Sequence, residues 1–195
     1  GYVRAEGAGM VVLKPLALSG SRGVMRADDA AGFVQAFDRL RRLLDAADVR
    51  AERDAAHQMT MIESFIPGAE FAVEGLLEHG ELRLLAICDK PDPLDGPFFE
   101  ETIYLTPSRA PQETQDRIIA AVRAAIAALG LRHGPVHAEC RVDLSRRPGA
   151  VDPAPVYVLE VAARPIGGLC SQALRFEGPG GGIVSLEEVL LRHAL

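Results

Sequence analysis

The sequence predicts an α+β fold made of two lobes, divided near Pro67. The first third of the chain has the pattern strand, glycine-rich loop, strand, helix and strand. The remainder predicts a larger, mostly antiparallel sheet with one long amphipathic helix. The regular alternation of strand and helix that is typical of a doubly wound nucleotide-binding fold is absent. We therefore expect a smaller lobe over residues 1–66 and a larger lobe over residues 67–195.

The elements of the smaller lobe follow from its apolar runs and the residues that interrupt them. Short apolar runs flank a glycine-rich loop and predict two strands. A helix with an apolar face and an arginine-rich face follows, and a charged, alanine-rich stretch comes after it. In order, we expect strands at residues 11–13 and 24–26, a helix capped by Asp28, a mobile connection over residues 45–57 and a strand at residues 59–66.

The larger lobe is predicted in the same way. A His79-Gly80 turn joins two strands into a hairpin, and Gly130 ends the long helix in the usual C′ position. We expect strands at residues 70–77, 82–89, 102–105, 136–144 and 156–162, helices at residues 111–129, 169–174 and 186–195, and a glycine linker at residues 178–182.

The composition excludes several classes of function. The 195 residues carry a net charge of −6, with 48% apolar and 25% charged residues, as in ordinary globular proteins. Because the chain has no basic cluster and no tryptophan, we do not expect nucleic acid as a partner. We expect neither a membrane span nor an export signal. Cys88, Cys140 and Cys170 lie in or beside apolar runs without metal-ligand spacing, which predicts free thiols in a reducing cytoplasm.

A glycine-rich loop follows Lys14, one of only two lysines in the chain. Its backbone N–H groups and the lysine charge are suited to phosphate oxygens, but a tight hairpin turn explains the same pattern. The spacing does not fit a P-loop, in which the lysine follows the glycines. The loop residues are Ser19, Gly20, Ser21, Arg22 and Gly23.

A second candidate region surrounds the turn at Pro67. Backbone groups near Glu63 and Phe65 could face an adenine edge, and Glu70 could accept hydrogen bonds from ribose hydroxyls. An ordinary strand with two solvated carboxylates is the alternative interpretation.

The third candidate region is a pair of strands in the larger lobe. His137 and Glu139 share one face of the strand at residues 136–144, and Glu160 lies within the apolar strand at residues 156–162. If the two strands pair, Glu139 and Glu160 come within reach of one cation, and carboxylate oxygens suit Mg²⁺. A solvent-facing sheet surface of mixed charge is the alternative, and His137 fits a hydrogen-bonded pocket residue better than a ligand.

Arg164 follows these strands and precedes the sequence Pro-Ile-Gly-Gly. Its guanidinium offers fixed donors to a phosphate or an acyl phosphate, and the two glycines allow close backbone approach. A plain turn is the alternative.

Together, the order and spacing of these motifs resemble the ATP-grasp superfamily, in particular its carboxylate–amine ligase branch, which includes biotin carboxylase and D-alanine–D-alanine ligase. The resemblance implies an ATP-grasp fold, in which two α+β lobes hold ATP between them. The matching segments span residues 11–168 and read VVLKPLALSGSRGV, IESFIPGAEFAVEG, AICDK, GPVHAECRV and VLEVAARPIGG.

The resemblance also implies residue roles. Lys14 would hold the ATP phosphates, and the loop at residues 19–23 would close over them. Glu63 and Phe65 would present their backbone to adenine, with Glu70 on the ribose. In the larger lobe, Lys90 would lie near the phosphates or the substrate, Glu139 and Glu160 would hold Mg²⁺ (or Mn²⁺), and Arg164 would stabilise the transferring phosphoryl group.

The activity implied is ATP-dependent ligation in the cytoplasm. A carboxylate becomes an acyl phosphate, an amine attacks it, and ADP and phosphate are released. Alternatives are a bicarbonate-activating enzyme of the biotin carboxylase type and a non-catalytic nucleotide-binding domain. The sequence names neither the carboxylate nor the amine, and it leaves a homodimer open.

Two departures from the family pattern stand out. The usual Glu-x-Asn-x-Arg is Glu-Val-Ala-Ala-Arg here, so Ala162 replaces an asparagine that would help to hold a second Mg²⁺. Asp143 is a candidate replacement ligand. We also expect that the N-terminal substrate domain of such ligases is absent from this chain.

Overall fold

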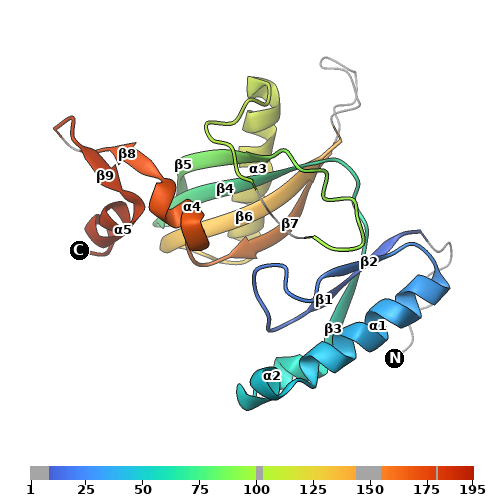
Figure 1. Cartoon of the computed structure of the whole chain (residues 1–195). Helices are drawn as coiled ribbons and strands as arrows, with labels where there is room; N and C mark the ends of the chain where they lie inside the picture. The colour runs from blue at the N-terminus through green and yellow to red at the C-terminus, as the bar shows by residue number, and fades with distance from the viewer. Residues whose placement is uncertain (1–8, 100–102, 144–154, 179) are drawn as a thin grey trace. The chain divides into compact units, whose positions relative to one another are not determined.

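The computed structural model describes residues 9–99, 103–143, 155–178 and 180–195 (Figure 1). These residues form two compact units. The first contains the described residues of Gly1–Pro67 and Asp92–Thr102, and the second contains those of Gly68–Pro91 and Ile103–Leu195.

The first unit is a small antiparallel sheet with one long helix. Its strands β1 (Val11–Pro15), β2 (Met25–Ala27) and β3 (Thr60–Ser64) lie in the order β2-β1-β3. Helix α1 (Ala30–Leu44) buries Leu40 and Leu44 against Leu13 and Met25 of the sheet. The predicted strand, loop, strand, helix and strand are therefore confirmed in this order.

Two details of the first unit differ from the sequence prediction. The cap of α1 is Asp29 rather than Asp28, because the Asp29 side chain accepts the Gly32 N–H at 2.7 Å. The stretch predicted as a mobile connection contains helix α2 (Ala47–Ala51) and the 3-10 helix η1 (Ala55–Gln58). Val49 is fully buried there, so a single apolar side chain anchors a segment whose composition indicated a loop.

Residues 92–99 belong to the first unit although they are far from its strands in sequence. The Arg26 backbone N–H donates to the Pro97 carbonyl at 3.0 Å, and the Arg26 guanidinium lies 4.3 Å from the Phe65 ring centroid. The Arg39 guanidinium lies 4.8 Å from the ring centroid of Phe98. The contacts of Pro97 and Phe98 explain why residues 92–99 belong to the same compact unit as the strands of the N-terminal part of the chain.

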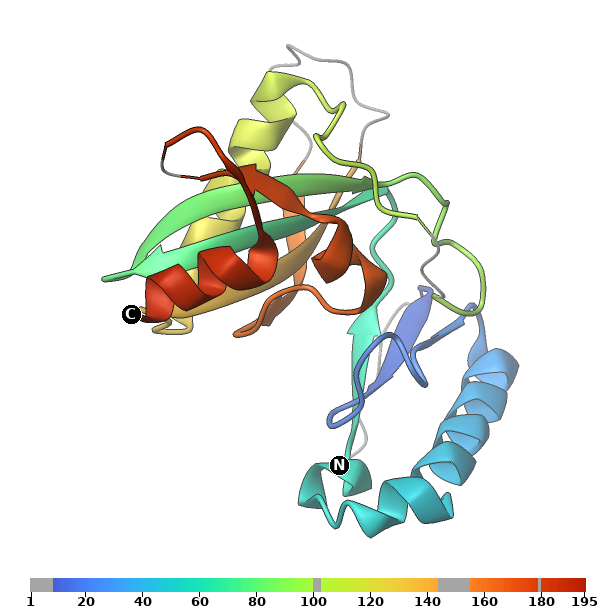
Figure 2. The same cartoon turned by 60° about the vertical axis from the view of Figure 1, so that its left-hand side comes forward.

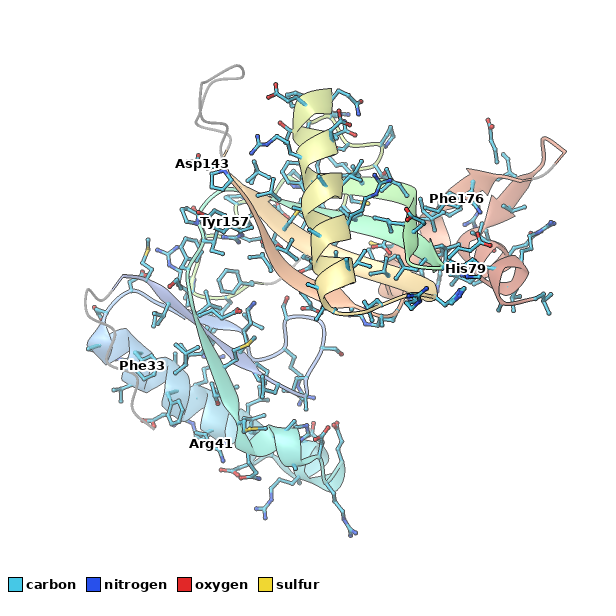
Figure 3. All side chains as sticks on the ribbon, turned by 180° about the vertical axis from the view of Figure 1, so that it is seen from behind. Phe33, Arg41, His79, Asp143, Tyr157 and Phe176 are labelled. Atoms are coloured by element: carbon cyan, nitrogen blue, oxygen red, sulfur yellow. The ribbon has the colours of Figure 1, made fainter. Side chains whose placement is uncertain are left out.

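The second unit is built on a four-stranded antiparallel sheet. Strands β4 (Ala69–Glu78), β5 (Glu81–Lys90), β6 (Gly134–Val142) and β7 (Val156–Ala162) lie in the order β5-β4-β6-β7. Helix α3 (Gln112–Ala128) covers one face, as Figure 3 shows. The helix buries Ile118, Val122 and Ile126 against Val73 and Ala138. Gly130 has φ +70° after the end of α3, which confirms its predicted C′ role.

The opposite face of this sheet carries the C-terminal elements (Figure 2). These are α4 (Gly168–Ala173), the antiparallel pair β8 (Arg175–Glu177) and β9 (Ile183–Ser185), and α5 (Leu186–Ala194). Leu76 of β4 packs against Val184 and Val189, which fixes them to that face.

Two predictions for the second unit are wrong. The glycines expected to form a linker instead lie in the β8–β9 turn, where the Gly178 N–H donates to the Gly182 carbonyl at 2.7 Å. Of the strand expected at residues 102–105, residue 102 lies outside the described residues, and Leu105 forms only an isolated bridge with Asp89. Residues 144–154, between β6 and β7, also lie outside the described residues.

None of the described helices is long and apolar enough to cross a membrane. Cys88, Cys140 and Cys170, all among the described residues, form no disulfide; Cys88 and Cys140 are buried and Cys170 is half-buried. Burial, together with the nearby negative charge of Glu74, raises the pKa of Cys88 to about 11. Burial also raises the pKa of Cys140 to about 12. Both buried thiols are therefore protonated at neutral pH and act as core residues.

Candidate active site

A row of charged side chains occupies the sheet face opposite α3. Strand register puts Glu70 beside both Lys90 and Arg141, and puts Glu74 beside His137. Because side chains alternate along a strand, apolar partners such as Val73 point to the other face, into the α3 core. The alternation predicted for β6 is confirmed, and it concentrates charge on one side of the second unit.

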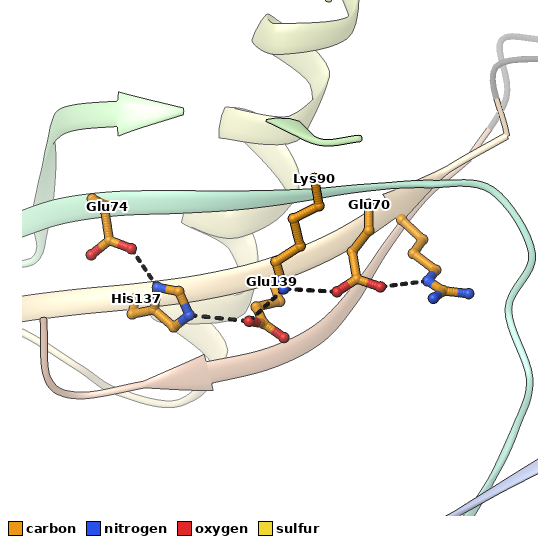
Figure 4. A network of polar contacts seen from close by, with 6 residues as sticks. Glu70, Glu74, Lys90, His137 and Glu139 are labelled. Atoms are coloured by element: carbon orange, nitrogen blue, oxygen red, sulfur yellow. Dashed lines mark hydrogen bonds and ion pairs between the residues drawn. The ribbon is translucent and has the colours of Figure 1, made fainter. Parts of the chain in front are cut away.

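Lys90 lies at the centre of this row (Figure 4). Its Nζ is 2.8 Å from Glu70 Oε1 and 2.8 Å from Glu139 Oε1, and only 2% of its side chain is exposed. Arg141 Nε donates to the other oxygen of Glu70 at 2.7 Å. Glu70 was predicted to bind ribose, and in the structure both of its oxygens are bound by these two cations, with 7% of its side chain exposed.

His137 extends the row toward Glu74. Its Nδ1 contacts Glu74 Oε1, and its Nε2 lies 3.2 Å from Glu139 Oε1. Burial works to lower the pKa of His137, but the hydrogen bonds and negative charges of Glu139 and Glu74 outweigh it and raise the pKa to about 9. His137 is therefore an imidazolium at neutral pH and donates through both ring nitrogens.

The row is electrically balanced. Glu70, Glu74 and Glu139 contribute three negative charges, and Lys90, Arg141 and protonated His137 contribute three positive charges. Burying charges is tolerated when they are paired in this way.

Glu139 and Glu160 are the predicted metal ligands, and they are direct neighbours across β6 and β7. Burial works to raise the pKa of Glu139, but the hydrogen bonds and charges of His137 and Lys90 lower it to about 2, so the carboxylate is ionised. Glu160 is exposed. Two adjacent carboxylates fit Mg²⁺, which usually keeps waters and substrate phosphates as its other ligands. Within the described ranges no group of three or more His, Cys, Asp or Glu side chains could hold a metal, so such additional ligands would be required.

Asp143 cannot replace the asparagine that Ala162 lacks. Ala162 pairs with His137, whereas Asp143 follows the opposite end of β6 (Figure 3). Six residues of strand separate these levels, which is roughly 20 Å at the usual rise. The prediction of Asp143 as a substitute ligand is therefore wrong.

Arg164 begins the segment that leaves β7. Its side chain is exposed, and its Nη1 donates to the Pro165 carbonyl at 3.1 Å. Two residues later, the buried Ile166 N–H donates to Glu74 Oε2 at 3.0 Å. The segment is thus tied by its backbone to the charged row, while the guanidinium faces outward.

The predicted phosphate-binding residues lie in the first unit. Lys14 Nζ is 2.5 Å from Glu63 Oε2, and both side chains are partly exposed. The loop at residues 19–23 connects β1 and β2, and Gly20, Ser21 and Gly23 all have positive φ. Such a backbone suits glycine and strains Ser21, which is the kind of local strain that clusters at functional loops. The guanidinium of Arg22 pairs with Asp48 at 2.8 Å.

The residues expected to face adenine have partners within the first unit. Glu63 belongs to β3 and pairs in register with Val12. The Phe65 N–H donates to the Met10 carbonyl at 2.8 Å, and its ring lies 6.4 Å from that of Phe99, measured between centroids.

Sequence reasoning missed Glu74 and gave Arg141 no role. The available signal was that Glu70 and Glu74 are four residues apart in a strand and must share a face. A carboxylate within the apolar run Val-Glu-Gly-Leu-Leu is costly to bury, which is itself an indication of a partner.

The pKa values predict how stability depends on pH. The pKa of His137 is raised from 6.5, so its contribution is complete below about pH 6 and is lost as pH rises through about 9. The pKa of Glu139 is lowered from 4.5, so its contribution is present above about pH 5 and is lost as pH falls toward 2. Urea unfolding in EDTA should therefore show a maximum near pH 5–6. The variant His137→Gln should have a flatter alkaline limb than the wild type, and equal alkaline slopes would contradict the assignment.

Known proteins resemble this chain over most of its length. The family model of the ATP-grasp domain matches residues 9–173. Alanine–anticapsin ligase of Bacillus subtilis is 27% identical over an alignment of 157 residues, and the match covers 74% of this chain and 32% of that protein. The chain thus spans about a third of the length of the curated relatives it matches.

Solved structures show the same relationship. The L-amino acid ligase of Bacillus licheniformis superposes with a TM-score of 0.70 and 32% identity, covering 94% of this chain and 40% of that one. The biotin carboxylase of Campylobacter jejuni superposes with a TM-score of 0.59 and 20% identity, covering 84% of this chain and 33% of that one. The second likeness is one of fold alone.

Proposed function

The chain belongs to the ATP-grasp domain family, and on this premise we propose that it is the ATP-binding catalytic part of a ligase that joins a carboxylate to an amine. The observation that carries the proposal is the register of β6 and β7, which sets Glu139 opposite Glu160. Strand β7 ends at Ala162, two residues after Glu160, and leads directly into the segment that carries Arg164. Paired carboxylates on strands that lead to an exposed arginine suit phosphoryl transfer, in which positioning and charge stabilisation provide most of the catalysis.

The residues of the first unit would bind ATP. Lys14 would contribute a point charge to the phosphates, and the loop at residues 19–23 would contribute backbone N–H groups. Backbone groups near Glu63 and Phe65 would face adenine, as the resemblance implies.

The residues of the second unit would act on the reacting groups. Glu139 and Glu160 would hold Mg²⁺, which neutralises charge on phosphate oxygens when it is bound. Lys90 would keep Glu139 ionised and oriented, because its Nζ lies 2.8 Å from Glu139 Oε1. Arg164 would donate to the transferring phosphoryl group, and its planar fork of N–H donors matches phosphate oxygens.

The reaction has two steps. A carboxylate oxygen of the substrate attacks the γ-phosphorus of ATP, the bond to the β-phosphate oxygen breaks, and ADP leaves. A neutral amine then attacks the acyl carbon, the bond from carbon to the phosphate oxygen breaks, and phosphate leaves as the nitrogen loses a proton. The names of two relatives refer to alanine and to L-amino acids, so we propose an α-amino acid as one substrate.

Ala162 favours one alternative, a nucleotide-binding domain without catalytic activity. It stands where the family usually has an asparagine, and a hydrocarbon side chain cannot bind a metal ion. The test is ADP release by the whole protein with MgATP and pools of amino acids, other carboxylates and amines. ADP that appears only with both a carboxylate and an amine supports the ligase. ADP that needs bicarbonate alone supports a carboxylase, and ATP binding without any ADP supports the non-catalytic domain.

A further inference from the structure

Glu74 is a buried carboxylate that the proposed mechanism does not use. Its side chain is 2% exposed, in the middle of β4, which makes it the most enclosed acid of the charged row. An isolated carboxylate in such a place would be strongly destabilising, so its partners are needed to keep it there.

The two oxygens of Glu74 bind different parts of the second unit. Oε1 accepts from His137 Nδ1, and Oε2 accepts the Ile166 N–H at 3.0 Å. Ile166 is 6% exposed and follows Arg164-Pro165. Because the proline ring fixes φ at residue 165, holding the Ile166 amide restricts the backbone that carries Arg164.

His137 transmits this constraint to Glu139. Its Nε2 lies 3.2 Å from Glu139 Oε1, the oxygen that Lys90 also contacts at 2.8 Å. Two donors on one oxygen fix the plane of a carboxylate better than one.

We propose that Glu74 and His137 are positioning residues, which hold the Glu139 carboxylate (Figure 4) and the Arg164 segment together in one fixed geometry. The inference rests on the proposed function, because Glu139 and Arg164 have their roles there. Groups that orient a metal-binding carboxylate or histidine commonly affect metal affinity or activity by 10–100-fold. The buried carboxylate of Glu74 would thus fix the positions of both Glu139, which binds the metal, and Arg164, which binds the phosphoryl group.

Steady-state kinetics of the whole protein test this inference. Glu74→Gln and His137→Gln should each lower kcat by about 10–100-fold and change the KM for ATP by less than about threefold. The kcat of the double variant should be no lower than the kcat of the less active single variant, because both residues act through one chain of contacts. His57→Gln is the matched control, since His57 is a buried histidine (4% exposed) in the first unit whose Nε2 lies 3.4 Å from Glu52 Oε2. It should keep the wild-type kcat at equal folded fraction.

Metal binding provides a readout that is independent of ligation. Electron paramagnetic resonance with Mn²⁺ and ATP should show about tenfold weaker Mn²⁺ binding for His137→Gln and Glu74→Gln, and unchanged binding for His57→Gln. Wild-type Mn²⁺ affinity in both variants would overturn the inference, as would a wild type that binds no Mn²⁺ with ATP. If the wild type forms no ADP from any substrate pool, the proposed function fails. The Mn²⁺ comparison still decides whether Glu74 and His137 position Glu139.

Discussion

Arg164→Ala is expected to lower kcat by about 100–1,000-fold while changing the KM for ATP by less than about threefold. The reason is that charge on the transferring phosphoryl group increases in the transition state, so a donor aimed at that group stabilises the transition state more than bound ATP. Arg164 is exposed, and its Nη1 donates to the neighbouring Pro165 carbonyl, so removing the guanidinium leaves no buried charge behind. Initial rates at varied MgATP, with saturating carboxylate and amine, measure both constants.

Arg175→Ala is the matched control for this prediction. Arg175 is also an exposed arginine of the second unit, and its Nη1 donates to the Gln172 and Leu174 carbonyls at 2.6 and 2.8 Å. Its removal should leave kcat unchanged. Arg164→Lys should recover only part of the activity, because an ammonium group lacks the planar fork of donors. Equal losses in kcat and in ATP affinity would contradict this role and would show that Arg164 binds ATP before the reaction as strongly as it binds the transition state.

Local periodicity was sufficient to predict much of the fold. The apolar stripe of α3, with Ile118, Val122 and Ile126, indicated a helix, and these side chains are fully buried against the sheet. The alternation in β6 indicated one polar and one apolar face, and the structure confirms it. The Glu139–Glu160 pairing also followed, because each strand was placed and antiparallel pairing of neighbours is common.

The rest depended on contacts that no local pattern encodes. Glu74 and His137 are 63 residues apart, and only the register of β4 against β6 sets them side by side. A one-residue slip would send each side chain to the other face, so composition alone cannot reveal such a pair. The β8–β9 hairpin was missed for a similar reason, because its three-residue strands are too short to show alternation.

Lys90→Met is expected to destabilise the protein by about 3–5 kcal/mol, which is the usual cost of removing one partner from a buried ion pair. Lys90 is 2% exposed and lies between Glu70 and Glu139, so its loss leaves two buried carboxylates with less positive charge nearby. Arg141 would remain beside Glu70, and His137 would remain beside Glu139. Urea unfolding at pH 7 measures the change in the free energy of unfolding.

The other lysine of the chain provides the control for Lys90. Lys14 also pairs with a glutamate, Glu63, but 20% of the lysine and 40% of the glutamate side chain are exposed. Lys14→Met should therefore change stability by less than about 1 kcal/mol, because water solvates both partners and screens their attraction. The penalty for Lys90→Met should shrink as pH falls toward 5, because a carboxylate that has lost its cation binds a proton more readily. Equal effects of the two substitutions, or a Lys90 penalty that does not change with pH, would show that the charged row is not held together by its ion pairs.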